Sequence, residues 1–149
     1  MVLGEFDFSK YLGRWNLERQ STDGATMDGE ACLTRSGQRF DYEERGTLRL
    51  ANGQNFPFSR SYYFVVESGN LRSYFDEALS SLFLDLRIVE SDDKHVGYAV
   101  HPCSDDRYQA TFTFEQSSFT TEYVVEGPRK NFVLTTTYSA FPRRFMGDK

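Results

Sequence analysis

The sequence has few cysteines, no excess of positive charge and no long apolar run. No stretch approaches the length that a membrane-spanning helix needs, and the first residues carry Glu5 and Asp7 in place of the apolar core of a signal peptide. The net charge of −5 argues against a nucleic-acid or anionic-membrane partner, because such partners attract positive surfaces. Cys32 and Cys103 have no export signal before them, so we expect reduced thiols. These absences predict a soluble, cytoplasmic protein.

Long helical periodicity is also missing. The 149 residues match the length of one ordinary domain, which we place at residues 1–149, without an internal repeat or linker. Aromatic residues make up 16% of the chain and charged residues 26%, so there is enough apolar material for a core. We therefore expect one folded domain that is built without long helices.

Period-two alternation takes the place of the helical pattern. In the clearest case Tyr108, Ala110, Phe112 and Phe114 share one face, and polar residues alternate with them on the other face. This pattern is typical of a strand with one side against a core. Asn-Gly, Ser-Gly-Asn and Gly-Pro turn signals separate such segments. The protein is therefore predicted to be all-β.

The turn signals divide the chain into about nine or ten short strands. We place them at about residues 15–19, 29–33, 40–48, 56–67, 71–76, 81–90, 95–102, 108–115, 119–126 and 131–140. Short links make neighbouring strands antiparallel, which leaves a sandwich or a closed barrel, and closure is favoured because it removes exposed edges. A helical turn around residues 6–11, capped by Asp7 or Ser9, would plug one end. The predicted fold is an antiparallel meander β-barrel of about 8–10 strands with a short N-terminal plug.

The segment Gly13-Arg14-Trp15 follows this plug and opens the first strand. It resembles the Gly-x-Trp signature of lipocalins and fatty-acid-binding proteins. In those families the tryptophan packs across the closed base of the barrel, often under an arginine from the last strand. The resemblance implies that Trp15 closes the barrel and that Arg143 or Arg144 covers it.

A longer run of motifs extends over nearly the whole chain. The motifs are Trp15-x-Leu17-x-Arg19, Tyr42-x-Glu44-x-Gly46-x-Leu48, Arg60-x-Tyr62, His101-x-Cys103-x-x-Asp106-x-Tyr108, Val125-x-Gly127-Pro128-Arg129-Lys130 and Thr137-Tyr138. This run is similar to an uncharacterised lipocalin-like family, a domain of unknown function. The resemblance implies a calycin-type barrel and no established activity. Members often carry a histidine where this chain has Leu82-Phe83-Leu84, so no role that needs that histidine is expected here.

Two related families fit the residues less well. Fatty-acid-binding proteins place a helical lid after the first strand, whereas residues 21–24 form a turn signal here. Haem-binding nitrobindin-like barrels have a glycine-rich first-strand motif that this chain lacks, and only His95 and His101 are available to ligate iron. Haem stays a minor alternative, and the main expectation is a barrel without a cofactor.

Three charged residues fall on faces that alternation places inside the barrel. Arg19, Glu44 and Arg60 lie on separate strands, each in register with bulky apolar or aromatic residues. Charges inside a barrel are costly unless they are paired. They are therefore either a structural salt bridge, solvent-facing residues on a strand assigned to the wrong face, or the polar part of a ligand site. For such a site the aromatic hydroxyls on the same faces are candidate ligand contacts, namely Tyr42, Tyr62, Tyr108, Tyr123 and Tyr138.

Two turns carry further polar candidates. His101 precedes a turn at residues 104–106 and would act as donor, acceptor or base at a cavity mouth, but the spacing of this segment is not that of a metal site. Arg129 and Lys130 form either a solvated hairpin or a clamp for a phosphate or carboxylate. We expect no metal.

Three functions remain open at this point. The first is a barrel that encloses a small, partly apolar molecule with a polar or anionic group. The alternative is an enzyme of the isomerase, lyase or hydrolase type that uses Glu44 or His101 as acid or base. An interaction barrel would instead expose a large apolar patch. The sequence favours the first, with a small molecule as partner, and indicates no oligomeric state.

Overall fold

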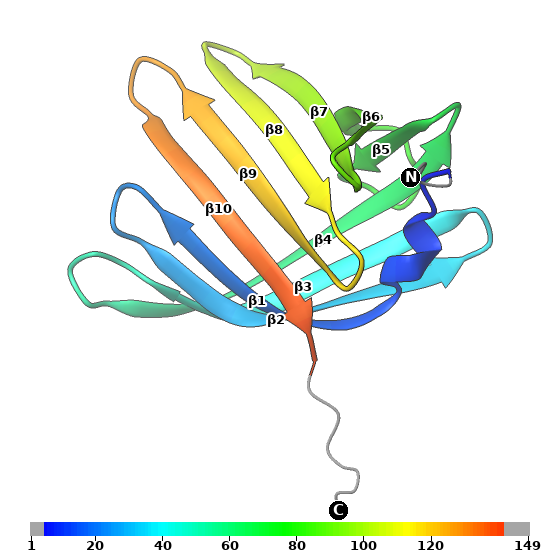
Figure 1. The fold of residues 1–149 in the computed structure, drawn as a ribbon. Helices are drawn as coiled ribbons and strands as arrows, with labels where there is room; N and C mark the ends of the chain where they lie inside the picture. The colour runs from blue at the N-terminus through cyan, green and yellow to red at the C-terminus, as the bar shows by residue number, and fades with distance from the viewer. Residues whose placement is uncertain (1–4, 142–149) are drawn as a thin grey trace, which may run out of the picture.

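A computed structural model of the chain describes residues 5–141. Ten strands form it: β1 (Gly13–Ser21), β2 (Thr26–Ser36), β3 (Arg39–Arg49), β4 (Asn55–Glu67), β5 (Asn70–Tyr74), β6 (Leu82–Ser91), β7 (Lys94–Cys103), β8 (Asp106–Phe114), β9 (Ser118–Glu126) and β10 (Asn131–Ala140). Each strand pairs with the next one in the chain, and β10 closes the barrel against β1 (Figure 1). The predicted all-β antiparallel meander barrel is confirmed.

The alternating pattern decides which side chains face the interior. On β8, Ala110, Phe112 and Phe114 are buried as the alternation predicts. On β1, Trp15 and Arg19 are both buried, although one is apolar and the other charged. The barrel therefore places charged side chains among its core residues.

A single 3-10 turn, η1 (Phe8–Tyr11), covers one end of the barrel. Asp7 caps it by accepting a hydrogen bond from the backbone N–H of Ser9 at 3.1 Å. The Phe8 ring contacts aromatic rings on β3, β4 and β8, and Tyr11 accepts a hydrogen bond from Trp15 Nε1 through its carbonyl at 2.9 Å. The predicted plug and the burial of Trp15 beside it are both observed.

Gly46 marks a close backbone approach between β2 and β3, and the ladder has no bulge there. Pairing of β2 with β3 runs through Gly29 and Gly46 without a shift. A Cβ at Gly46 would lie 2.1 Å from the carbonyl oxygen of Asp28. The strands therefore meet where neither glycine leaves room for a side chain.

The register shift of the barrel lies between β5 and β6. Ser73 pairs with Leu84 and Tyr74 pairs with Leu82, so Phe83 has no partner in the ladder. An unpaired residue of this kind changes the direction of its side chain. As a result Phe83 faces the interior next to Leu84.

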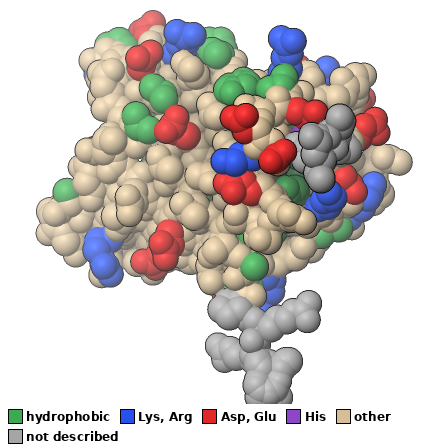
Figure 2. Space-filling view, viewed as in Figure 1, with side chains coloured by type: hydrophobic (Ala, Val, Ile, Leu, Met, Phe, Trp, Pro, Cys, Tyr) green, Lys and Arg blue, Asp and Glu red, His purple; other side chains and the backbone are tan. Residues whose placement is uncertain are grey.

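One face of the molecule carries both signs of charge. Acidic and basic side chains are interspersed on the face shown in Figure 2. Within residues 5–141, no helix has the length and apolar character needed to cross a membrane.

Candidate functional site

A cavity of about 350 Å³ occupies the interior of the barrel. Its lining is mainly aromatic and consists in large part of Phe8, Trp15, Tyr42, Tyr62, Phe64, Phe75, Phe83, Tyr108, Phe112, Phe114, Phe119, Tyr123, Phe132 and Tyr138. Arg60 and Phe75 line it while exposed to solvent. Along β4, Arg60 lies further from η1 than Phe64, which packs on Phe8. The cavity therefore opens at the end opposite to η1.

A buried ion pair forms the polar centre of the cavity wall. Arg19 on β1 donates from Nη1 to Glu44 Oε2 at 2.7 Å and from Nη2 to Oε1 at 2.9 Å. Burial alone would raise the pKa of Glu44, but the hydrogen bonds and charge of Arg19 lower it below its usual value. Burial likewise opposes the charge of Arg19, and the bonds to Glu44 outweigh it, so the pKa of Arg19 is raised. Both groups are therefore charged at neutral pH.

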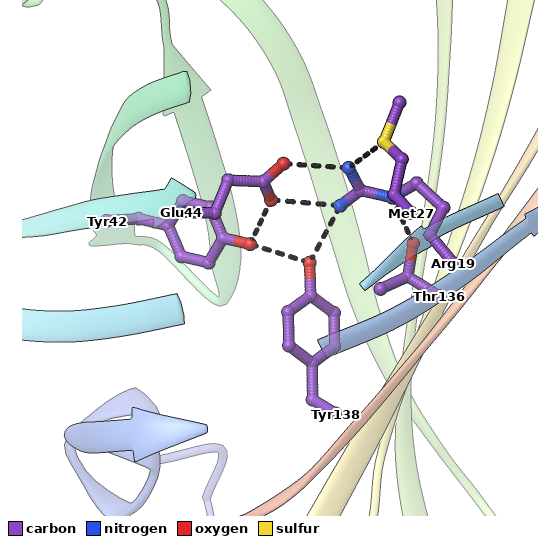
Figure 3. A network of polar contacts seen from close by, with 6 residues as sticks. All are labelled: Arg19, Met27, Tyr42, Glu44, Thr136 and Tyr138. Carbon is purple, nitrogen blue, oxygen red and sulfur yellow. Dashed lines mark hydrogen bonds and ion pairs between the residues drawn. The ribbon is translucent and has the colours of Figure 1, made fainter. Parts of the chain in front are cut away.

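The guanidinium of Arg19 has no donor hydrogen left for another partner. An arginine side chain carries five N–H donors. Besides the two bonds to Glu44, Arg19 donates from Nε to Thr136 Oγ1 at 2.6 Å, from Nη1 to Met27 Sδ at 3.3 Å and from Nη2 to Tyr138 OH at 3.5 Å (Figure 3). All five donors are thus directed into the protein.

Two tyrosine hydroxyls extend the pair into a chain of hydrogen bonds (Figure 3). Tyr42 donates its proton to Glu44 Oε1, which as a carboxylate oxygen can only accept. The 2.8 Å contact between Tyr42 and Tyr138 is therefore donated by Tyr138. Burial raises the pKa of Tyr138 to about 12 and raises that of Tyr42 well above its usual value. Both hydroxyls therefore keep their protons, and both protons are used inside the network.

The third predicted charge, Arg60, stands apart from this pair. It lies directly opposite Glu44 on the neighbouring strand, and its charge helps to lower the pKa of Glu44. Its side chain is exposed at the open end, and no ion pair or hydrogen bond of its guanidinium occurs among residues 5–141. The predicted cluster of three charges is therefore a closed pair with one further cation at its edge.

A second part of the cavity lining is a group of aromatic rings around Phe83. Its ring centroid lies within 6.5 Å of those of Tyr62, Phe75, His101, Tyr108 and Tyr123. Sequence reasoning identified four of these five neighbours but missed Phe75 and Phe83 itself. Phe83 lies within Leu82-Phe83-Leu84, where an unbroken apolar run gives no alternation from which a face can be read.

Residues 11–140 match DUF6314, a family of unknown function. The chain belongs to that family. Rv2717c from M. tuberculosis has the same fold, with 12% identity, a TM-score of 0.61, and coverage of 91% of this chain and 95% of that one. A redesigned β-barrel, mFAP1, bound to DFHBI, is 18% identical with a TM-score of 0.48 and coverage of 89% and 96%. No curated protein matches the sequence.

Two residues of the predicted site lie away from the cavity of this DUF6314 barrel. Lys130 is 3.4 Å from Asp106 Oδ2 and donates to the Tyr108 hydroxyl at 3.4 Å. Arg129 is exposed on the same turn. Neither side chain lines the cavity, whereas all other predicted site residues do.

The two histidines of this family member lie at different ends of the barrel. His101 lines the cavity at its open end, and His95 packs against Phe6 beside the plug. In the part of the chain that the structure describes, no group of three or more His, Cys, Asp or Glu side chains could hold a metal ion. Arg143 and Arg144, expected to cover Trp15, lie outside the described residues.

Proposed function

We propose that the protein binds a small, largely aromatic molecule inside its barrel and that an anionic group of this molecule lies beside Arg60. The observation that carries the proposal is the cavity itself. Its volume of about 350 Å³ and its aromatic lining with few polar groups are typical of small-molecule sites. A core built only for stability would be filled by side chains at close-packed density.

The charges of the lining support an anionic ligand group. Arg19 is neutralised by Glu44, so the net positive charge of the lining comes from Arg60. This side chain lies where the cavity meets solvent, so an anion can reach it without being fully desolvated. The planar guanidinium matches a carboxylate or sulfonate with two parallel hydrogen bonds.

Binding is better supported than acid–base catalysis by Glu44. A general base works best with a pKa near the operating pH, whereas Arg19 and Tyr42 hold the pKa of Glu44 below its usual value. Both carboxylate oxygens already accept hydrogen bonds from these neighbours. Glu44 therefore serves the structure of the wall rather than proton transfer.

Calorimetric titration with naphthalene-2-sulfonate tests the proposal. We expect saturable binding with one site per chain, and Arg60→Gln should weaken it by about fivefold, or about 1 kcal/mol for a partly exposed ion pair. Arg45→Gln is the matched control, because it removes the same charge from the outer face of the adjoining strand β3. Absence of binding, or equal loss in both variants, would contradict the proposal. Native mass spectrometry of the purified protein would show a ligand acquired during expression.

A further inference from the structure

We infer that the ligand group that reaches the Arg19–Glu44 network is an uncharged hydrogen-bond donor, such as an aromatic N–H or a hydroxyl, and not an anion. This inference rests on the proposed function and specifies how the ligand lies: the anionic group contacts the exposed guanidinium of Arg60, and a donor contacts the buried carboxylate of Glu44 on the neighbouring strand. It follows from counting donors and acceptors in the network.

The donors of the network are already used. The five N–H groups of Arg19 are directed at Glu44, Thr136, Met27 and Tyr138. Tyr42 donates to Glu44, and Tyr138 donates to Tyr42. A ligand carboxylate placed here would find no hydrogen to accept from these groups and would lie beside the charge of Glu44. Leaving an anion without hydrogen bonds in a buried site is costly.

An acceptor of the network remains open. A carboxylate oxygen accepts about two hydrogen bonds. Oε1 of Glu44 accepts two, from Arg19 Nη2 and from Tyr42, whereas Oε2 accepts one, from Arg19 Nη1. Glu44 lines the cavity, and its side chain is 1% exposed. The remaining acceptor site on Oε2 is therefore the one to which we assign the donor of a ligand that packs against this part of the wall. A bond to a charged acceptor is among the stronger hydrogen bonds in proteins.

The other polar groups nearby are compatible with this polarity. Tyr62, Tyr123 and Thr121 line the cavity and carry hydroxyls, each of which can donate or accept by rotating its hydrogen. They therefore adapt to a ligand of either kind and do not select between donor and acceptor. The selection rests with Glu44.

The experiment uses three ligands of nearly the same shape and charge. Indole-5-carboxylate carries an N–H donor, benzofuran-5-carboxylate replaces it by an acceptor oxygen, and 1-methylindole-5-carboxylate blocks it with a methyl group. We expect the wild-type protein to bind the first about tenfold more tightly than the other two in calorimetric titrations. Equal affinities, or preference for benzofuran, would overturn the inference while leaving the proposed function in place. Failure of all three to bind would count against both.

A double variant assigns the preference to the network. Arg19→Leu combined with Glu44→Leu removes donors and acceptor together, and replacing a buried ion pair by apolar residues often leaves a protein folded. We expect this variant to lose the preference for indole-5-carboxylate, with affinities for the first two ligands within about twofold of each other. If the double variant keeps the tenfold preference, the donor lies elsewhere and the inference is wrong. Arg60→Gln should weaken the binding of all three ligands by the same factor and should keep the preference for indole-5-carboxylate.

Discussion

Arg19 and Glu44 pair across a strand that lies between them. β1 and β3 each pair with β2 and not with each other, yet the two side chains meet at 2.7 and 2.9 Å. The positions of β2 beneath the pair include the small residues Gly29 and Ala31. The ion pair thus ties together three strands of the wall.

The first prediction concerns breaking this pair. Glu44→Gln leaves Arg19 buried without a counter-charge, so we expect unfolding free energy to fall by about 3–5 kcal/mol in urea denaturation. Arg19→Leu with Glu44→Leu should cost much less, about 1 kcal/mol or below, because no unpaired charge remains. Equal losses in the two variants would show that packing, and not charge, determines stability here.

The second prediction concerns alkaline pH. The pKa of Tyr138 is raised from 10.0 to about 12 by burial, so folding favours its protonated form. The stability that this raised pKa contributes is fully present below pH 10.0 and is lost as the pH rises through about 12. Between these two values the unfolded chain has released the proton of Tyr138, whereas the folded chain still keeps it. The pKa difference of Tyr138 corresponds to a loss of roughly 2–3 kcal/mol of unfolding free energy.

Urea denaturation at several pH values between 9 and 12 measures this loss. Tyr138→Phe has no proton to lose at this position, so its stability should fall less over the same range. Tyr42 also contributes stability that is lost at high pH, because burial raises its pKa. Since Tyr42 is present in both proteins, the difference between their curves reports on Tyr138. Parallel curves for wild type and Tyr138→Phe would refute the assignment.

Much of the fold could be read from the sequence because alternation and turn residues are local signals. Asp7 as a cap, the plug before Trp15 and the inward face of β8 all follow from residues close together in the chain. The inward positions of Arg19 and Glu44 follow in the same way, since each shares a face with buried aromatic or aliphatic neighbours.

The sequence alone does not show where the end of a long side chain lies. Alternation assigns Arg60 to the same face as Tyr62. It does not predict that the guanidinium of Arg60 is exposed to solvent, whereas that of Arg19 is buried against Glu44. Phe83 was missed because a register shift, which arises from the pairing of β5 with β6, decides its direction. The partners of Lys130 likewise come from another hairpin.

The third prediction tests the close approach of β2 and β3. A Cβ at Gly29 would lie 2.1 Å from the carbonyl oxygen of Arg45, and two backbones cannot move apart without weakening their ladder. Gly29→Ala should therefore reduce stability by about 1–3 kcal/mol or more. The exposed Ser59→Ala on β4 serves as control and should change stability by less than about 0.5 kcal/mol. A Gly29→Ala protein as stable as wild type would mean that the strands separate easily.

The last prediction concerns Trp15, the only tryptophan of the chain. Its ring packs on Phe119 at 5.0 Å, and its Nε1 bonds to the Tyr11 carbonyl at 2.9 Å, so it joins the plug to the barrel. Trp15→Ala removes both contacts and should cost about 3–5 kcal/mol in chemical denaturation. Trp15→Phe keeps an aromatic ring and loses the hydrogen bond. Its loss of unfolding free energy should therefore be smaller than that of Trp15→Ala by about 1–2 kcal/mol or more. Because Trp15 also lines the cavity, naphthalene-2-sulfonate should change its fluorescence. A Trp15→Ala loss below about 1 kcal/mol would show that the plug is dispensable for closing the barrel.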